Sequence, residues 1–262
     1  MDLGLRGKVA IVAAASKGLG RACAEELAAE GVKVVLCARG EEALEAARLA
    51  IVDGGGDAIA IRADVSRAED IERVVAMAME QYGQVDILVT NGGGPPPGPF
   101  DEHGEDAWKE GVDSTLLSVV RFVKGVLPGM KERGWGRIIN ITSIAVKQPV
   151  DGLILSNSIR AAVTGFARTL ANEVGRNGIT VNNVMPGFTW TDRVDELAEK
   201  QSAASGKDRD EIVAGWEASI PIGRLGEPRE LGALVAFLAS DRAAYITAQS
   251  IPVDGGWIRS LL

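Results

Sequence analysis

Histidine, cysteine and tyrosine are scarce in this sequence, which has one, two and two of them among 262 residues. The single histidine, His103, argues against histidine-based catalytic triads and multi-histidine metal sites. Cys23 and Cys37 lack the spacing of metal ligands, so neither zinc nor a disulfide is expected. This cysteine usage is typical of a reduced cytoplasm.

Basic clusters and long apolar runs are also missing. Lys and Arg number 28 against 36 Asp and Glu, which gives a formal net charge of −8, and the sequence pI is near 4.9. Apolar runs such as residues 9–15 are far shorter than the ~20 residues of a membrane span. The first six residues do not resemble a secretion signal. We therefore expect a cytoplasmic protein without nucleic-acid or membrane partners.

The sequence is otherwise that of a globular protein, 46% hydrophobic and 24% charged. Continuous apolar runs, typical of strands covered on both faces, predict strands at 8–14, 32–38, 58–62, 85–90, 137–142, 180–184 and 250–253. Longer amphipathic stretches predict helices at 19–30, 41–52, 68–82, 106–133, 153–176 and 228–240. This alternation predicts a single doubly wound α/β domain over residues 1–262, with ligands at the carboxyl ends of parallel strands.

Two segments interrupt the alternation. Residues 91–99 contain only asparagine, glycine and proline and follow a predicted strand, so they are expected to form a wall of the site. Residues 188–219 form a long, polar and partly helical insertion after another strand. It is either a surface excursion or a substrate lid, and its position at a strand's carboxyl end favours the lid.

A glycine turn joins the first predicted strand to its helix. Gly18 and Gly20 would let backbone N–H groups approach a diphosphate at the helix N-terminus, although tight helix–strand packing would also explain them. Arg39 follows the second strand, where a ribose-reading residue is expected. Together with Lys17 it favours the 2′-phosphate of NADP(H) over NAD(H).

With these features the chain resembles the short-chain dehydrogenase/reductase superfamily, in the branch of β-ketoacyl-carrier-protein reductases. The resemblance implies a seven-stranded Rossmann domain, a nicotinamide cofactor, a carbonyl/alcohol substrate and a homotetramer or homodimer. The matching C-terminal signatures are residues 224–228 and 253–256. The cofactor-binding residues that it implies are Ala14, Ser16, Lys17, Gly18, Leu19, Gly20, Arg39, Asp64, Val65, Asn91, Gly92, Gly93, Arg160, Pro186, Gly187, Thr189 and Thr191.

Several positions depart from the family pattern. Ser143 matches the catalytic serine, but Ser156 replaces the tyrosine and Arg160 replaces the lysine. Thr115 stands where the family has an asparagine, with Asp113 or Ser114 as alternatives. The first turn glycine is Ala14, which fits the turn if its φ stays negative.

These departures bear on proton transfer. A serine hydroxyl is a far weaker acid than a phenol, and a guanidinium stays charged, so Ser156 and Arg160 would not relay a proton as tyrosine and lysine do. Losing a general acid costs ~10²–10⁴ in rate. Three hypotheses therefore stay open: an atypical NADP(H)-linked reductase, a cofactor-binding scaffold or regulatory protein without reductase activity, and a repurposed non-redox enzyme that uses Arg160 as an oxyanion clamp.

A few other side chains could reach a site at this end of the sheet. Tyr82 and Tyr245 are interpreted as structural, and Lys147 as a solvated loop residue. His103 is expected to be inert, although its side-chain pKa range suits proton transfer near neutrality. Three aromatic residues of the insertion are equally compatible with a substrate pocket and with simple packing: Phe188, Trp190 and Trp216.

Overall fold

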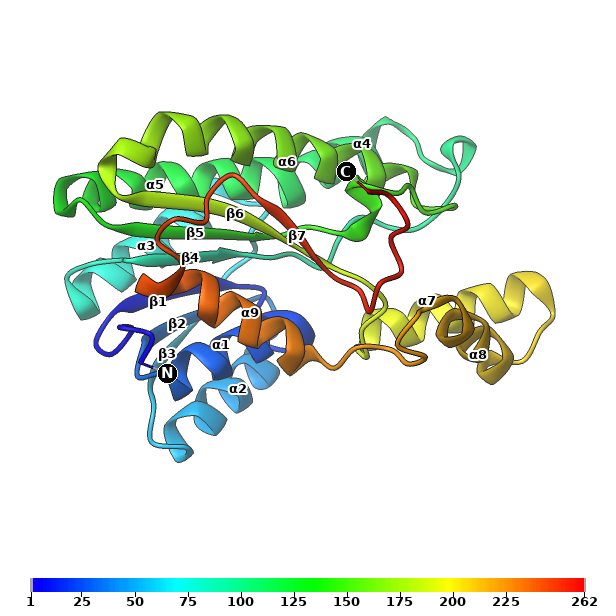
Figure 1. Cartoon of the computed structure of the whole chain (residues 1–262), viewed down its shortest axis with the longest axis horizontal. Coiled ribbons are helices and arrows are strands. Elements are labelled where there is room, and N and C mark those ends of the chain that lie inside the picture. Colours follow the sequence, from blue (N-terminus) through cyan, green and yellow to red (C-terminus); the bar gives the residue numbers. More distant parts are fainter. Residues whose placement is uncertain (1, 262) are drawn as a thin grey trace.

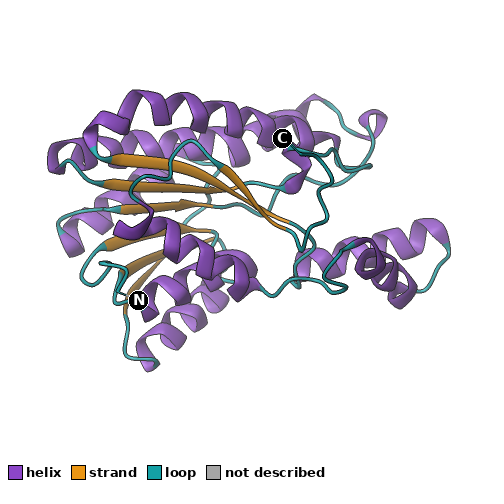
Figure 2. Ribbon diagram, in the orientation of Figure 1, coloured by secondary structure: helices purple, strands orange, loops and turns teal. Residues whose placement is uncertain are grey.

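The computed structural model describes residues 2–261. Seven parallel strands form one sheet in the order β3-β2-β1-β4-β5-β6-β7, with helices on both faces (Figures 1 and 2). The strands are β1 Val9–Ala13, β2 Lys33–Ala38, β3 Asp57–Arg62, β4 Ile87–Thr90, β5 Gly136–Ile141, β6 Ile179–Pro186 and β7 Ser250–Val253. The predicted doubly wound, seven-stranded fold is therefore confirmed.

The helices divide between the two faces of the sheet. One face packs against α1 (Gly18–Ala29), α2 (Glu41–Asp53) and α9 (Pro228–Ala239). The other packs against α3 (Ala68–Tyr82), α5 (Ser118–Arg133) and α6 (Ile154–Val174).

Neighbouring residues of a strand take part in opposite cores. Val12 and Val34 belong to the core under α1, α2 and α9, whereas Ile11 and Val35 belong to the core under α3, α5 and α6. Both faces of the strands are buried, which is why the sequence shows continuous apolar runs rather than alternation.

The stretch predicted as one helix at 106–133 is divided into three parts. Helix α4 (Glu105–Gly111) continues through a π-helical segment, Val112–Leu117, into α5. Ser114 donates its hydroxyl to the Glu110 carbonyl at 2.7 Å, and Ser118 donates to the Ser114 carbonyl at 2.7 Å. Such hydroxyls compete with backbone hydrogen bonds, and π-helical turns are frequent at functional sites.

The insertion after β6 contains two helices, α7 (Asp192–Ser205) and α8 (Arg209–Ser219), which stand beside the main body (Figure 1). They surround a small apolar cluster of their own. Within it Phe188 stacks on Trp216 with ring centroids 4.8 Å apart, and Trp257 meets Phe188 edge-on at 5.9 Å. Phe188 and Trp216 therefore pack against each other, and Trp190 packs against the same cluster. Among residues 2–261 there is no helix long and apolar enough to cross a bilayer.

Candidate active site

The turn between β1 and α1 lets another group approach its backbone closely. Gly18 has φ +52°, and a Cβ atom on Gly20 would lie 2.3 Å from the Ala14 carbonyl oxygen, so Gly20 admits no side chain. Helix α1 begins after Lys17 without a side-chain capping bond. Its first N–H groups are therefore available to an anion at the positive end of the helix dipole. These residues fit the diphosphate of a dinucleotide.

Ala14 differs from the expectation of a negative φ. Its φ is +49°, in the left-handed region that favours glycine. The turn thus keeps the backbone path of a glycine while carrying a methyl group. Asn91, directly after β4, donates its side-chain amide to the Ala14 carbonyl at 3.4 Å and connects the turn to the next loop.

Two cations expected near the cofactor behave differently. Arg39 is exposed directly after β2, and its side chain has no ion pair among residues 2–261. Arg62, which the sequence analysis did not single out, donates its Nε to the Arg39 carbonyl at 3.3 Å. Lys17 instead pairs with Asp192 of α7, Nζ to Oδ2 at 3.0 Å. Both partners of that pair are largely exposed, so it holds α7 over the turn only weakly.

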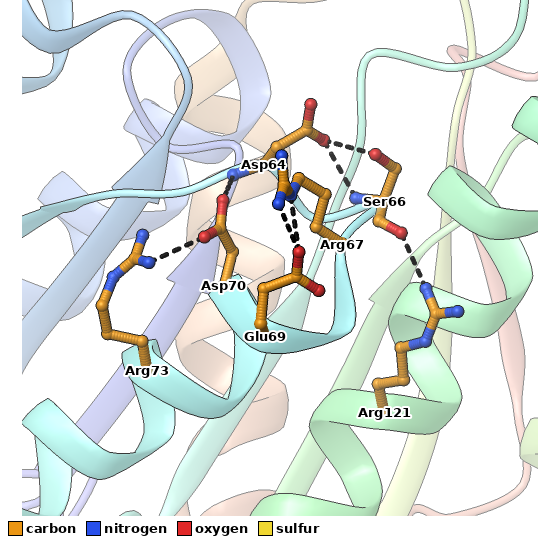
Figure 3. Close-up of polar contacts among 7 residues, drawn as sticks. All are labelled: Asp64, Ser66, Arg67, Glu69, Asp70, Arg73 and Arg121. Carbon is orange, nitrogen blue, oxygen red and sulfur yellow. Dashed lines mark hydrogen bonds and ion pairs between the residues drawn. The ribbon is translucent and has the colours of Figure 1, made fainter.

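A polar network supports the loop after β3 (Figure 3). Asp70 accepts a hydrogen bond from the Asp64 backbone N–H at 2.8 Å, and Ser66 donates its hydroxyl to Asp64 Oδ1 at 2.8 Å. The Asp64 N–H bond lowers the pKa of Asp70, with a further contribution from Arg73. Arg121 of α5 donates to the Ser66 carbonyl at 2.8 Å and to Asp113 at 2.8 Å. The network therefore connects the Asp64 loop to the π-helical segment.

A pocket lies at the carboxyl ends of β4 and β5. It brings together the predicted residues Asn91, Gly92, Thr115 and Arg160, and Thr115 lies in the π-helical segment at its wall. Ser114, the alternative to Thr115, also lines it, together with hydroxyl groups of Thr90, Ser118 and Thr142 that the sequence analysis did not assign.

Arg160 is the one charged side chain that lines this pocket in the described part of the chain. Its Nη1 donates to the Ile141 carbonyl at 3.0 Å and to the Thr142 carbonyl at 2.8 Å, which places the guanidinium at the end of β5. Burial lowers the pKa of Arg160 to about 10, with a further contribution from the charge of Arg193. The group thus remains cationic at neutral pH.

The two serines lie nearby but outside the lining of the pocket. Ser143 follows β5, and its hydroxyl oxygen accepts a hydrogen bond from the Ala145 N–H at 3.1 Å. Ser156 is half-buried in the first turn of α6, one helical turn before Arg160. The two tyrosines lie elsewhere: Tyr82 donates to Asp57 at 2.8 Å beside the start of β3, and Tyr245 is fully exposed. The pocket therefore has no phenol.

The loop after β6 also needs its glycine. A Cβ on Gly187 would lie 2.7 Å from the Asp254 Cα, and the Gly187 N–H donates to the Val253 carbonyl at 2.9 Å. Thr189 donates its hydroxyl to the Gly187 carbonyl at 3.3 Å, and Thr191 precedes α7 close to Gly18. Pro186, Gly187, Thr189 and Thr191 thus lead from the sheet edge to the glycine turn.

Two remaining candidates take no part in this pocket. Lys147 is exposed. His103 lies in the loop after the proline run, with a buried Nε2 that has no hydrogen-bond partner in the described structure. A Cβ on Gly98 would lie 2.8 Å from that nitrogen, so His103 packs against the glycine–proline loop.

Comparison with known proteins places this geometry in a family. The family model described as enoyl-(acyl carrier protein) reductase matches residues 13–258. A putative ketoacyl reductase of Streptomyces coelicolor is 39% identical over 95% of this chain and 96% of that protein. The chain belongs to the short-chain dehydrogenase/reductase superfamily.

Other members of this superfamily share both sequence and structure with the chain. The 3-oxoacyl-[acyl-carrier-protein] reductase FabG of Vibrio cholerae is 38% identical over 97% of this chain and 98% of that protein. L-sorbose reductase from Gluconobacter frateurii, solved with NADPH and L-sorbose, superposes with a TM-score of 0.94 at 33% identity, covering 100% of both chains. The predicted resemblance to ketoacyl reductases is confirmed, and the chain is a short-chain-type oxidoreductase by family.

Proposed function

We propose that this protein transfers hydride between NADP(H) and a small carbonyl/alcohol substrate, as a 3-oxoacyl reductase-like enzyme with an atypical site. The observation that carries this proposal is the position of Arg160 at the end of β5, in one pocket with Thr115 and the Asn91–Gly92 loop. Asn91 also contacts the glycine turn, so cofactor and substrate subsites adjoin. The family relatives that are named reductases support the same reaction class.

Each residue of this site has a chemical task. When bound, the nicotinamide supplies or accepts the hydride at the carbonyl carbon. Ser143 would polarise the carbonyl oxygen, and Ser156 would add a hydrogen bond. Arg160 supplies a fixed positive charge that stabilises the developing alkoxide and a donor for ribose hydroxyls. Because no phenol is available, the alkoxide takes its proton from water.

Preference for NADP(H) over NAD(H) is part of the proposal. Arg39 is exposed and unpaired within residues 2–261, and Arg62 lies beside it. The solved L-sorbose reductase and an actinorhodin polyketide ketoreductase variant, which has a TM-score of 0.93 at 38% identity, contain NADPH. Replacement Arg39→Asp is expected to reverse the ratio of NADPH to NADH affinities. Unchanged affinities for both cofactors would contradict this assignment.

Turnover tests the reductase itself. Purified protein is mixed with NADPH and a panel of ketones and 3-oxoacyl thioesters, and loss of absorbance at the reduced nicotinamide band is followed. Binding of NADPH without reduction of any carbonyl compound would refute the proposed reductase activity. The double replacement Ser156→Tyr, Arg160→Lys is expected to raise the rate by up to ~10²–10⁴ because it restores a general acid.

A second candidate is a cofactor-binding scaffold or regulatory protein without reductase activity. The lack of a phenol in the pocket favours it, since both tyrosines lie away from β4 and β5. Micromolar cofactor binding without turnover, and no gain from the double replacement, would support this candidate.

The remaining proposals concern the oligomeric state of the protein, its location in the cell and the role of the insertion after β6. We propose a homotetramer or homodimer in the cytoplasm, with residues 188–219 as a lid over the substrate. The net charge of −8 supports the absence of a nucleic-acid partner. Light scattering on the purified protein measures the subunit number, and a monomer would contradict the oligomer.

A further inference from the structure

Two guanidinium groups flank the glycine–proline loop after β4. Arg160 reaches it from α6: a Cβ on Gly94 would lie 3.2 Å from Arg160 Nη2. Arg193 reaches it from the first turn of α7, and its Nη2 donates to the Pro95 carbonyl at 2.9 Å. The two side chains therefore meet consecutive residues of one loop, although they are far apart in the sequence.

Neither guanidinium is neutralised by a close carboxylate. Both hydrogen bonds of the Arg160 guanidinium run from Nη1 to backbone carbonyls at the end of β5, and within residues 2–261 its Nη2 makes no hydrogen bond. For Arg193 the paired carboxylate is Glu196, at 4.0 Å, the limit of an ion pair. The charge of Arg193 contributes to the lowered pKa of Arg160, so the two cations interact. Like charges held together in this way are relieved by an anion between them.

The direction of Arg193 separates this site from the diphosphate turn. Its neighbour Asp192 reaches Lys17 at the turn after β1, whereas Arg193 reaches Pro95 in the loop after β4. Successive helical residues point about 100° apart, so α7 presents a carboxylate to the turn after β1 and a cation to the loop after β4. Because the diphosphate is assigned to the turn after β1, we assign the anion at the loop after β4 to the substrate.

We propose that Arg160 and Arg193 together bind a carboxylate of the substrate, so that the substrate is a small carbonyl compound with a free carboxylate. This inference rests on the proposed reductase function for its substrate, and it adds the charge of that substrate. A guanidinium N–H is a strong donor to a carboxylate, and Arg160 Nη2 and Arg193 Nη1, which are not bonded to backbone carbonyls, would approach it from two different helices. Arg193, on α7, binds it only while the lid lies over the loop.

The test compares acetoacetate with its uncharged methyl ester, with NADPH present. Replacement Arg193→Gln is expected to raise the KM for acetoacetate about 10- to 100-fold, the worth of a charge-assisted hydrogen bond. The KM for methyl acetoacetate should change by less than about twofold, because the ester has no carboxylate for Arg193 to bind. Lys200→Gln, which removes an exposed cation from the same helix, is the matched control and should change neither constant.

Two further outcomes keep this inference separate from the reductase proposal. If no carbonyl compound is reduced, acetoacetate binding to the protein–NADP⁺ complex is measured by calorimetry. Binding that Arg193→Gln abolishes would support the carboxylate site while the reductase proposal fails. Equal preference for acid and ester, or equal effects of Arg193→Gln on both, would overturn the carboxylate site even if turnover is robust.

Discussion

The methyl group of Ala14 offers a sharp test of the cofactor turn. Its φ of +49° lies in the left-handed region, which costs an L-residue about 1–2 kcal/mol. Replacement Ala14→Gly removes this strain, but the extra freedom of glycine in the unfolded chain returns about 0.5–1 kcal/mol. The midpoints of these ranges differ by about 0.75 kcal/mol, which corresponds to a gain of about 2–3 °C in Tm for a chain of this size.

The turn already has a glycine-like path, so the replacement should stabilise free and bound protein alike. We therefore expect the Kd for NADPH to change by less than about twofold, measured by calorimetry, while urea unfolding and the thermal midpoint report the gain. Ala248 is the matched control: with φ +59°, it is the other non-glycine residue of positive φ among residues 2–261. Ala248→Gly should give a similar gain in stability.

Two results would refute this reasoning. A lower Tm for Ala14→Gly would mean that the methyl group contributes more through packing than its backbone conformation costs. A gain in NADPH affinity of more than about tenfold, or about 1.4 kcal/mol, would mean that the methyl group obstructs the diphosphate.

Three other predictions follow from the structure. Gly20→Ala should abolish NADPH binding, because its Cβ would collide with the Ala14 carbonyl, whereas Gly165→Ala, in open space on α6, should bind normally in the same titration. Hydrogen bonds from Arg224 and the Glu227 N–H lower the pKa of Glu230 to about 2. Its stabilisation is thus complete above pH 4.5 and lost as pH falls toward 2, and Glu230→Gln should flatten that part of the urea-unfolding pH profile. Burial raises the pKa of both cysteine thiols to about 12, so Ellman's reagent at pH 8 should react with neither until the protein unfolds.

The strands were predictable because burial on both faces leaves a simple signature. Predicted and observed strands differ by at most two residues at either end, and β7 and the helix α3 agree residue for residue. The break in the helix predicted at 106–133 was not predictable, because apolar periodicity continues through it. Ser114 and Ser118, whose hydroxyls bond back to carbonyls of the preceding turn, mark the break only once the structure is known.

Site residues that follow the end of a strand could be predicted from the sequence, whereas contacts between distant segments could not. The glycine turn and Arg39 follow strand ends, where parallel strands put their ligands, so their place could be inferred from order along the chain. The sign of φ at Ala14 could not, because it depends on how α1 packs against β1. Lys17 was assigned to a cofactor phosphate, but its partner Asp192 lies on a helix that the sequence shows only as an insertion.

The contacts of α7 explain why the approach of Arg193 to the loop after β4 was not predicted from the sequence. Arg193 differs in no local way from the other exposed arginines of the chain, and its contact with Pro95 spans 98 residues. Arg160 was identified because it occupies a family position. The role proposed for it extends to anion binding because a second guanidinium, that of Arg193, contacts the same loop. A lysine-to-arginine change that only held ribose would need no companion cation. The convergence of two cations on Gly94 and Pro95 therefore argues that this site was altered to bind negative charge, and not merely relieved of a proton relay.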